Sequence, residues 1–188
     1  MTRTMKWVVV NLVLTAAVAA LPALGAQNSS ANRPSPPPHQ PGSYLKQAVG
    51  HQLRLLPYYS LFDNLEYKID GYHVTLLGQV VRPTLKSEAE NVVKKIEGVQ
   101  GVTNHIQVLP VSPMDHRIRL AEYRAIYGQP TLNRYALQAV PPIHIIVDNG
   151  HVTLVGVVAD QMDKNVAGIQ AKTVHGVFSV TNDLRVEK

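Results

Sequence analysis

The chain has 188 residues, of which 45% are hydrophobic and 16% are charged, and this globular composition excludes an overall disordered protein. It contains no cysteine, which excludes disulfides, thiolate metal sites and a thiol nucleophile. Its 18 Lys and Arg residues outnumber its 13 Asp and Glu residues only slightly. So mild an excess argues against a dedicated nucleic-acid-binding protein, which usually carries a dense basic stripe.

The first 26 residues have the pattern of a secretory signal peptide. Arg3 and Lys6 make a positively charged start, residues 7–21 form an uncharged apolar run, and residues 23–26 supply small side chains for cleavage. The apolar run is shorter than the ~20 residues that a membrane-spanning helix needs, so an uncleaved anchor is the less favoured alternative. No cysteine follows the run, and we therefore expect an exported protein that is not lipidated.

A proline-rich, disordered tether is expected over residues 27–42, which read QNSSANRPSPPPHQPG. The prolines exclude a helix or a central strand, and the stretch has no apolar periodicity. We interpret it as a flexible, partly extended linker, with a proline-rich docking motif as the alternative.

After the tether, the hydrophobic pattern predicts five elements in the order helix, strand, strand, helix, strand. Pro57 marks the end of the first helix, Gly98 ends the second, and Asp70-Gly71 makes the turn between the first two strands. The predicted elements span residues 43–56 (helix), 65–69 and 74–80 (strands), 86–97 (helix) and 102–108 (strand).

The second half of the chain repeats the first at a shift of 78 residues, and residues 70–108 align with it without a gap. The segment HVTLLGQV at 73–80 falls on HVTLVGVV at 151–158. The inward strand positions carry the same residues in both copies, whereas the outward positions differ more. A shared core with divergent surfaces produces this pattern.

The second copy differs ahead of its first strand. Its first helix is expected over 116–127, and apolar residues in the longer connection after it predict a short extra helical turn near 132–137. We therefore predict an α+β protein with two tandem modules, at 43–109 and 115–188. The short link between them should restrict their relative orientation.

Two spaced motifs recur in both copies: Val-Thr-Leu-x-Gly-x-Val and, after a helix, Gly-Val-x-x-Val-x-Asn. They lie at 74–80 with 98–104, and at 152–158 with 176–182. Residues 43–188 thus resemble tandem members of the BON-domain family of bacterial envelope proteins. The resemblance implies a three-stranded sheet with two helices on one face, an extracytoplasmic location, attachment to phospholipid membranes and no catalytic residues. Many two-domain members also carry a lipidated cysteine, which this chain lacks.

No pattern in the sequence indicates a catalytic or metal site. His73 and His151 are the only histidines at equivalent positions, but they belong to different modules, and a metal needs three or four converging ligands. The sequence has neither a nucleophile-elbow motif nor a Gly-rich phosphate loop. We therefore predict no enzyme, no cofactor and no metal.

Four motif glycines are interpreted as structural: Gly78, Gly98, Gly156 and Gly176. Gly78 and Gly156 fall in the middle of predicted strands at inward positions, where glycine usually marks a close approach of other atoms. We interpret this approach as packing against the helices, with a bound ligand as the alternative.

The outward face of the second sheet carries an apolar patch that the first lacks. Its candidate interface residues are Ile146, Val155 and Val157, and exposed patches of this kind usually mark contacts. We hypothesise that the patch docks against the other module or a partner. The alternative is that the longer connection, residues 130–142, folds over it.

A second candidate surface is basic and aromatic. Arginines with interfacial tyrosines suit an anionic lipid surface, and Phe178 adds an aromatic residue where the first copy has Gln100. The alternative is that the tyrosines belong to the core and the arginines only solvate the helix. The candidate membrane contacts are Arg117, Arg119, Tyr123, Arg124, Tyr127, Arg134, Tyr135 and Phe178.

These observations predict a non-enzymatic, exported protein that is periplasmic or peripheral to the outer membrane. Its tandem domains are expected to associate with a phospholipid surface or with envelope components. The alternative is a soluble periplasmic protein-interaction or chaperone-like protein of the stress-response type, acting through the apolar face of the second copy. No nucleic-acid partner is expected.

Overall fold

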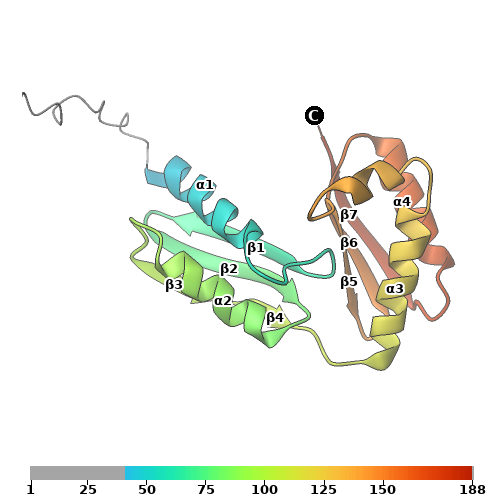
Figure 1. Cartoon of the computed structure of the whole chain (residues 1–188), viewed down its shortest axis with the longest axis horizontal. Helices are drawn as coiled ribbons and strands as arrows, with labels where there is room; N and C mark the ends of the chain where they lie inside the picture. The colour runs from blue at the N-terminus through green and yellow to red at the C-terminus, as the bar shows by residue number, and fades with distance from the viewer. Residues whose placement is uncertain (1–40, 188) are drawn as a thin grey trace, which may run out of the picture. The chain divides into compact units, whose positions relative to one another are not determined.

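The computed structural model describes residues 41–187, so the expected signal peptide and nearly all of the tether lie outside the described residues. The first module follows the expected order of elements (Figure 1). Its first helix begins two residues before the expected start. The elements are α1 (Pro41–Arg54), β1 (Asn64–Asp70), β2 (His73–Val80), α2 (Pro83–Lys94), β3 (Gly101–Asn104) and β4 (Gln107–Val108).

The second module repeats this order and adds one short helix. The extra helical turn expected near 132–137 is the 3-10 helix η2 (Asn133–Leu137). The other elements are α3 (Pro113–Tyr127), β5 (Ile143–Asp148), β6 (His151–Val158), α4 (Gln161–Thr173) and β7 (Ser179–Val186). The α+β class and the two repeated modules are thus confirmed.

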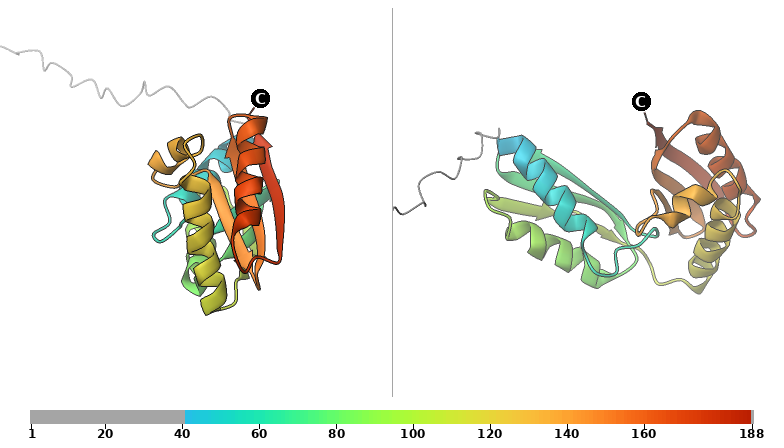
Figure 2. Two further views of the ribbon diagram at one scale, coloured as in Figure 1. Left: turned by 90° about the vertical axis from the view of Figure 1, so that its right-hand side faces the viewer. Right: turned by 45° about the horizontal axis from the view of Figure 1, so that its top comes forward.

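Each module is a small mixed sheet with both helices packed on one face (Figures 1 and 2). The first two strands form an antiparallel hairpin, and the last strand runs parallel to the second. In the first module, β3 and β4 follow one another along the same side of β2 and together take the place of the third strand. The parallel return requires the crossover through α2 or α4.

The asparagine that ends the second motif ties the last strand to the second helix. Asn104 Nδ2 donates to the carbonyl of Lys86 at 3.0 Å, and its Oδ1 accepts from the Ile106 amide at 3.1 Å. Asn182 makes the equivalent bonds to Lys164 and Leu184. The motif residue therefore satisfies a helix carbonyl and a strand amide at once, which explains its place in both copies.

Each module has its own hydrophobic core between the sheet and the helices. The inward strand residues are buried in both, as their alternation predicted. The first core includes Val49, Leu76, Val80, Ala89 and Ile106. The second includes Ile118, Ile126, Ile145, Leu154, Ala167 and Leu184.

Gly78 and Gly156 are required by a backbone approach, not by the helices. Both have positive φ, +108° and +128°. A Cβ at Gly78 would collide with the carbonyl of Asn64, and one at Gly156 with the carbonyl of Pro142. The predicted packing against the helices is therefore corrected: the start of the neighbouring strand closes in on each glycine.

A turn from the first module enters the second module, and the sequence did not indicate this contact. Leu61 and Phe62 pack against the second core, and the Leu61 carbonyl accepts from the Ile145 amide at 2.7 Å. The buried Asp63 holds the turn through the Ser60 amide and hydroxyl. Both modules belong to one compact unit within the described residues.

Candidate functional site

Three segments meet at one end of the second module, and we call this region the loop tip. It consists of the first turn of α3, the turn between β5 and β6, and the loop that leads into β7. Buried Asp115 joins the first two segments, because its carboxylate accepts from the amides of Asn149 at 3.0 Å and Gly150 at 2.8 Å. The Phe178 amide donates to the Gly150 carbonyl at 2.9 Å and adds the third segment.

The loop tip exposes large apolar side chains. Phe178 is 78% exposed, and its ring lies 6.0 Å from that of His151. Met114 is 45% exposed and lies beside Gly176. Because Asp115 and the backbone bonds fix the surrounding segments, these side chains are presented on a rigid support.

The outer face of α3 continues this surface. Arg117, Leu120 and Arg124 follow one another at helical spacing from Met114, and all are exposed, as is Tyr123. We call Met114, Arg117, Leu120, Tyr123 and Arg124 the outer stripe of α3. It alternates apolar bodies with positive charges, and no ion pair to another described residue neutralises Arg117 or Arg124.

Three predicted membrane contacts are instead buried: Arg119, Tyr127 and Tyr135 are only 4%, 5% and 8% exposed. Arg119 Nη2 donates to the Val147 carbonyl and the Tyr127 hydroxyl to the Ile143 carbonyl, each at 2.6 Å. Burial lowers the pKa of Arg119 and raises that of Tyr127. These residues lie on the sheet-facing side of α3 and cannot reach a membrane from there.

Tyr135 and Arg134 form a polar cluster with α4. The Tyr135 hydroxyl donates to the Asp163 carboxylate at 2.5 Å and accepts from the Ala159 amide at 2.8 Å. Arg134 forms an ion pair with the same carboxylate and stacks over the Tyr135 ring. Arg134 stays partly exposed, but its charge is largely neutralised, so it adds little to a cationic surface.

The three residues of the predicted apolar patch have different surroundings. Ile146 is buried and lines a hollow together with Gln79, Gln107 and Leu109 of the first module. Val155 and Val157 remain partly exposed. They belong to a groove of about 670 Å³, which we call the seam groove.

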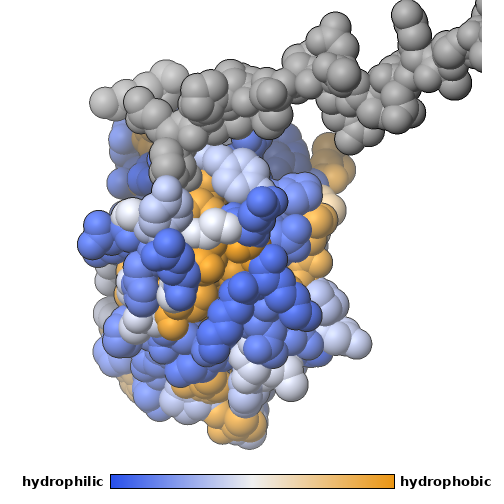
Figure 3. All heavy atoms as spheres, turned by 90° about the vertical axis from the view of Figure 1, so that its left-hand side faces the viewer, coloured by the Kyte–Doolittle hydropathy of each residue, from blue (hydrophilic) through white to orange (hydrophobic). Residues whose placement is uncertain are grey.

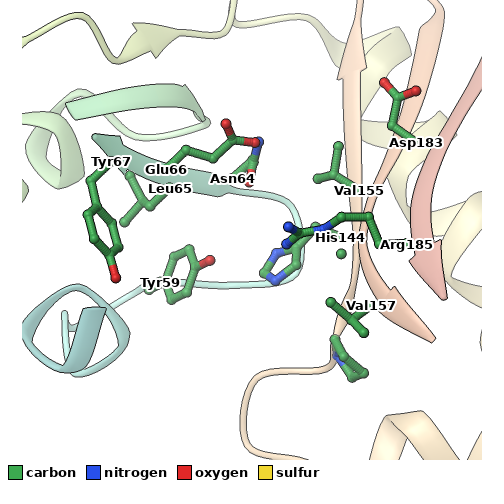
Figure 4. A pocket seen from close by; sticks show the side chains of 12 residues that line it. Tyr59, Asn64, Leu65, Glu66, Tyr67, His144, Val155, Val157, Asp183 and Arg185 are labelled. Carbon is green, nitrogen blue, oxygen red and sulfur yellow. The ribbon is translucent and has the colours of Figure 1, made fainter. Parts of the chain in front are cut away.

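Residues from both modules line the seam groove (Figure 4). Tyr59 and consecutive residues of β1 form one side, and residues of β6 and β7, including Arg185, form the other. Tyr59 stacks on His144 with ring centroids 5.6 Å apart. Figure 3 shows another face of the molecule, on which hydrophilic residues surround hydrophobic areas.

Glu122 on α3 is fully buried, and neither of its carboxylate oxygens has a partner among the described residues. Burial disfavours the charged form and raises the pKa of Glu122 to about 8. The sequence-based expectations include no buried acid on this helix. Its spacing of four residues from both Ile118 and Ile126, which are core residues, was the signal that it points inward.

The equivalent histidines hold strand ends together. His73 bonds to Thr103 at 2.8 Å, and His151 bonds to Ser179 at 2.7 Å, across the second and last strands. Over residues 41–187, no three His, Asp or Glu side chains gather as metal ligands. No helix in this range is long and apolar enough to cross a membrane.

Comparisons with known proteins identify the repeated unit. A comparison with curated proteins finds no match. Two solved structures of CdsD, a structural protein of the type III secretion system of Chlamydia trachomatis, are 13% and 14% identical, with TM-scores of 0.27. Each comparison covers 77% of this chain and 98% or 94% of the other. The family model described as "BON domain" matches residues 53–110 and again 131–188. The chain therefore belongs to the BON-domain family and carries two BON domains in tandem.

Proposed function

We propose that this protein is a non-enzymatic, exported envelope protein that binds anionic phospholipid surfaces peripherally through its second domain. Membership of the BON family indicates a function linked to phospholipid or the envelope. The proposal adds the surface: the outer stripe of α3 together with Phe178. We also propose the domain limits 43–109 and 115–188, and a periplasmic or outer-membrane-peripheral location without lipidation.

The observation that carries the proposal is the pairing of exposed apolar side chains with unpaired arginines. Phe178 and Met114 lie exposed on a rigid tip, and they lose contact with water when they enter the headgroup region. Arg117 and Arg124 carry charges that no described acid neutralises, and each contributes on the order of 1 kcal/mol at an anionic surface.

Removing the two charges is expected to weaken binding to phosphatidylglycerol vesicles by about tenfold or more. The variant is Arg117→Gln with Arg124→Gln, and vesicle co-sedimentation at low salt measures the effect. Phe178→Ala should weaken binding by a further several-fold, because it removes an apolar anchor. Raising the salt concentration should release the unmodified protein, because exposed charges are screened.

A matched control carries the same change in charge on the first domain, as Arg54→Gln with Lys95→Gln, at exposed positions. It should bind vesicles nearly as well as the unmodified chain. Equal losses in both double variants would show a general charge effect and refute the outer stripe as the binding surface. Sedimentation with neither anionic nor neutral vesicles would refute membrane binding altogether.

A further inference from the structure

The two domains treat equivalent sheet edges differently. β1 and β5 are the first strands of their sheets, and each pairs with a neighbour on one side only. The other side of such a strand presents unpaired backbone N–H and C=O groups, which are a template for another strand.

The edge of β5 is closed by three contacts. Alternate residues of β5 point their backbone groups away from β6, and one backbone group of each of these three residues has a partner. Tyr127 bonds the Ile143 carbonyl at 2.6 Å, Leu61 bonds the Ile145 amide at 2.7 Å, and Arg119 bonds the Val147 carbonyl at 2.6 Å. No strand can add to β5 without displacing these groups.

The equivalent edge of β1 is open. The counterparts of Ile145 and Val147 are Tyr67 and Ile69, and within residues 41–187 no loop or side chain bonds their backbone groups. The Tyr59 hydroxyl bonds the backbone of Leu65, which is two residues before Tyr67 and also lies on this edge. The Tyr67 side chain turns to α1, where its hydroxyl donates to the Lys46 carbonyl at 2.8 Å.

This open edge lines the seam groove. Four consecutive residues of β1, from Asn64 to Tyr67, line it. Successive side chains of a strand point to opposite faces of the sheet, so four consecutive residues cannot all line a groove through one face. They line it together because the edge of the strand borders the groove. Across the groove lie the apolar Val155 and Val157, with Arg185 beside them (Figure 4).

We propose that the seam groove binds an extended segment of another polypeptide, which adds to the free edge of β1 as a further strand. The backbone of the segment pairs with Tyr67 in the groove and continues to Ile69, the next edge residue beyond the groove lining, and its alternate apolar side chains rest on Val155 and Val157. The volume of about 670 Å³ suits a short segment. A second copy fits poorly, because its own β1 lies inside an equivalent groove.

The test uses the mature chain and a fluorescein-labelled peptide of alternating threonine and valine with a lysine at each end. Fluorescence anisotropy should show saturable binding. Hydrogen exchange of the Tyr67 and Ile69 amides should slow by about tenfold or more when the peptide binds, because both become paired. The same peptide with alternate backbone nitrogens methylated keeps its side chains but loses its donors, and it should not bind.

Val157→Asp places a charge on the apolar wall and should weaken peptide binding by about tenfold. The matched control is Val111→Asp, at a position that is 99% exposed and outside the groove, and it should leave binding unchanged.

Three results overturn the proposal: no binding of the alternating peptide, equal binding of the methylated peptide, or protection of amides other than those of β1. Concentration-dependent dimers lost in Val157→Asp would assign the groove to a second copy instead. Protection of Tyr67 by phosphatidylglycerol vesicles, and not by peptide, would assign it to lipid. Loss of vesicle binding in the outer-stripe variants leaves this proposal untouched, because the two surfaces share no residue.

Discussion

Replacing Gly156 with alanine is expected to destabilise the second domain by about 3 kcal/mol or more. The residue has φ of +128°, which L side chains rarely adopt, and a Cβ there would collide with the Pro142 carbonyl. Strand β5 begins directly after Pro142, so relieving the collision means moving the strand away from β6. Urea unfolding followed by circular dichroism measures the loss in the free energy of unfolding.

Gly71→Ala is the matched control. Gly71 also has a positive φ, +57°, but nothing lies within 4 Å of its Cβ position. This variant therefore carries only the backbone penalty of the left-handed conformation, about 1 kcal/mol. If Gly156→Ala cost no more than Gly71→Ala, the close approach of the Pro142 carbonyl would not be the reason for this glycine.

Glu122→Leu is expected to raise the free energy of unfolding at pH 8 by a few kcal/mol and to have a much smaller effect near pH 5. The folded chain holds the pKa of Glu122 at about 8, whereas the unfolded chain releases the proton near the ordinary glutamate value of 4.5. The folded state therefore binds more protons between these values. Its stability falls as the pH rises from about 4.5 to about 8.

Leucine removes this fall, because it packs in the core without ionising. The first domain has an apolar residue at the position equivalent to Glu122, which supports replacing Glu122 with leucine. Leu45 lies against Gly98 as Ile118 lies against Gly176, so buried Val49 is the counterpart of Glu122. Urea unfolding at pH 5, 6.5 and 8 measures the slope, with exposed Glu97→Leu as the control of the same chemistry. An unchanged slope in Glu122→Leu would show that Glu122 does not carry the pH dependence.

His144 is expected to lower the stability of the folded chain at acidic pH, in contrast to Glu122, which lowers it at alkaline pH. Burial lowers the pKa of His144 below the ordinary histidine value of 6.5, so as the pH falls the unfolded chain takes up a proton before the folded chain does. Its contribution to stability is present above pH 6.5 and is lost as the pH falls through the lowered pKa. The acid limb should therefore persist in Glu122→Leu.

The repeat, the order of elements and the inward strand residues could be predicted because their signals are local. Period-two alternation around Val74 and Leu76 says which face of a strand is buried without knowing what buries it. The matching residues 78 positions later then report the same fold twice. Asn104 and Asn182 occupy equivalent places in this repeat, and the helix carbonyl that each of them bonds lies 18 residues earlier in the chain.

Only part of the candidate membrane surface could be predicted from the sequence. Exposure of Arg117, Arg124 and Phe178 agreed with the pattern, but Arg119 and Tyr127 are buried against β5. The polar ends of Arg and Tyr can reach a backbone carbonyl across a core, so residue type alone does not decide between surface and interior. Only the partner does, and the Val147 and Ile143 carbonyls are far away in the sequence.

The sequence by itself determined that this protein consists of two copies of one α+β module with a shared core and divergent surfaces. The tertiary structure decided which surfaces are available. The turn at Leu61 and the side chains of α3 close the edge of β5, whereas the edge of β1 stays open beside Val155 and Val157. The reason is physical: hydrophobic periodicity records burial along one segment, but an edge is closed or left open by groups that only folding brings to it.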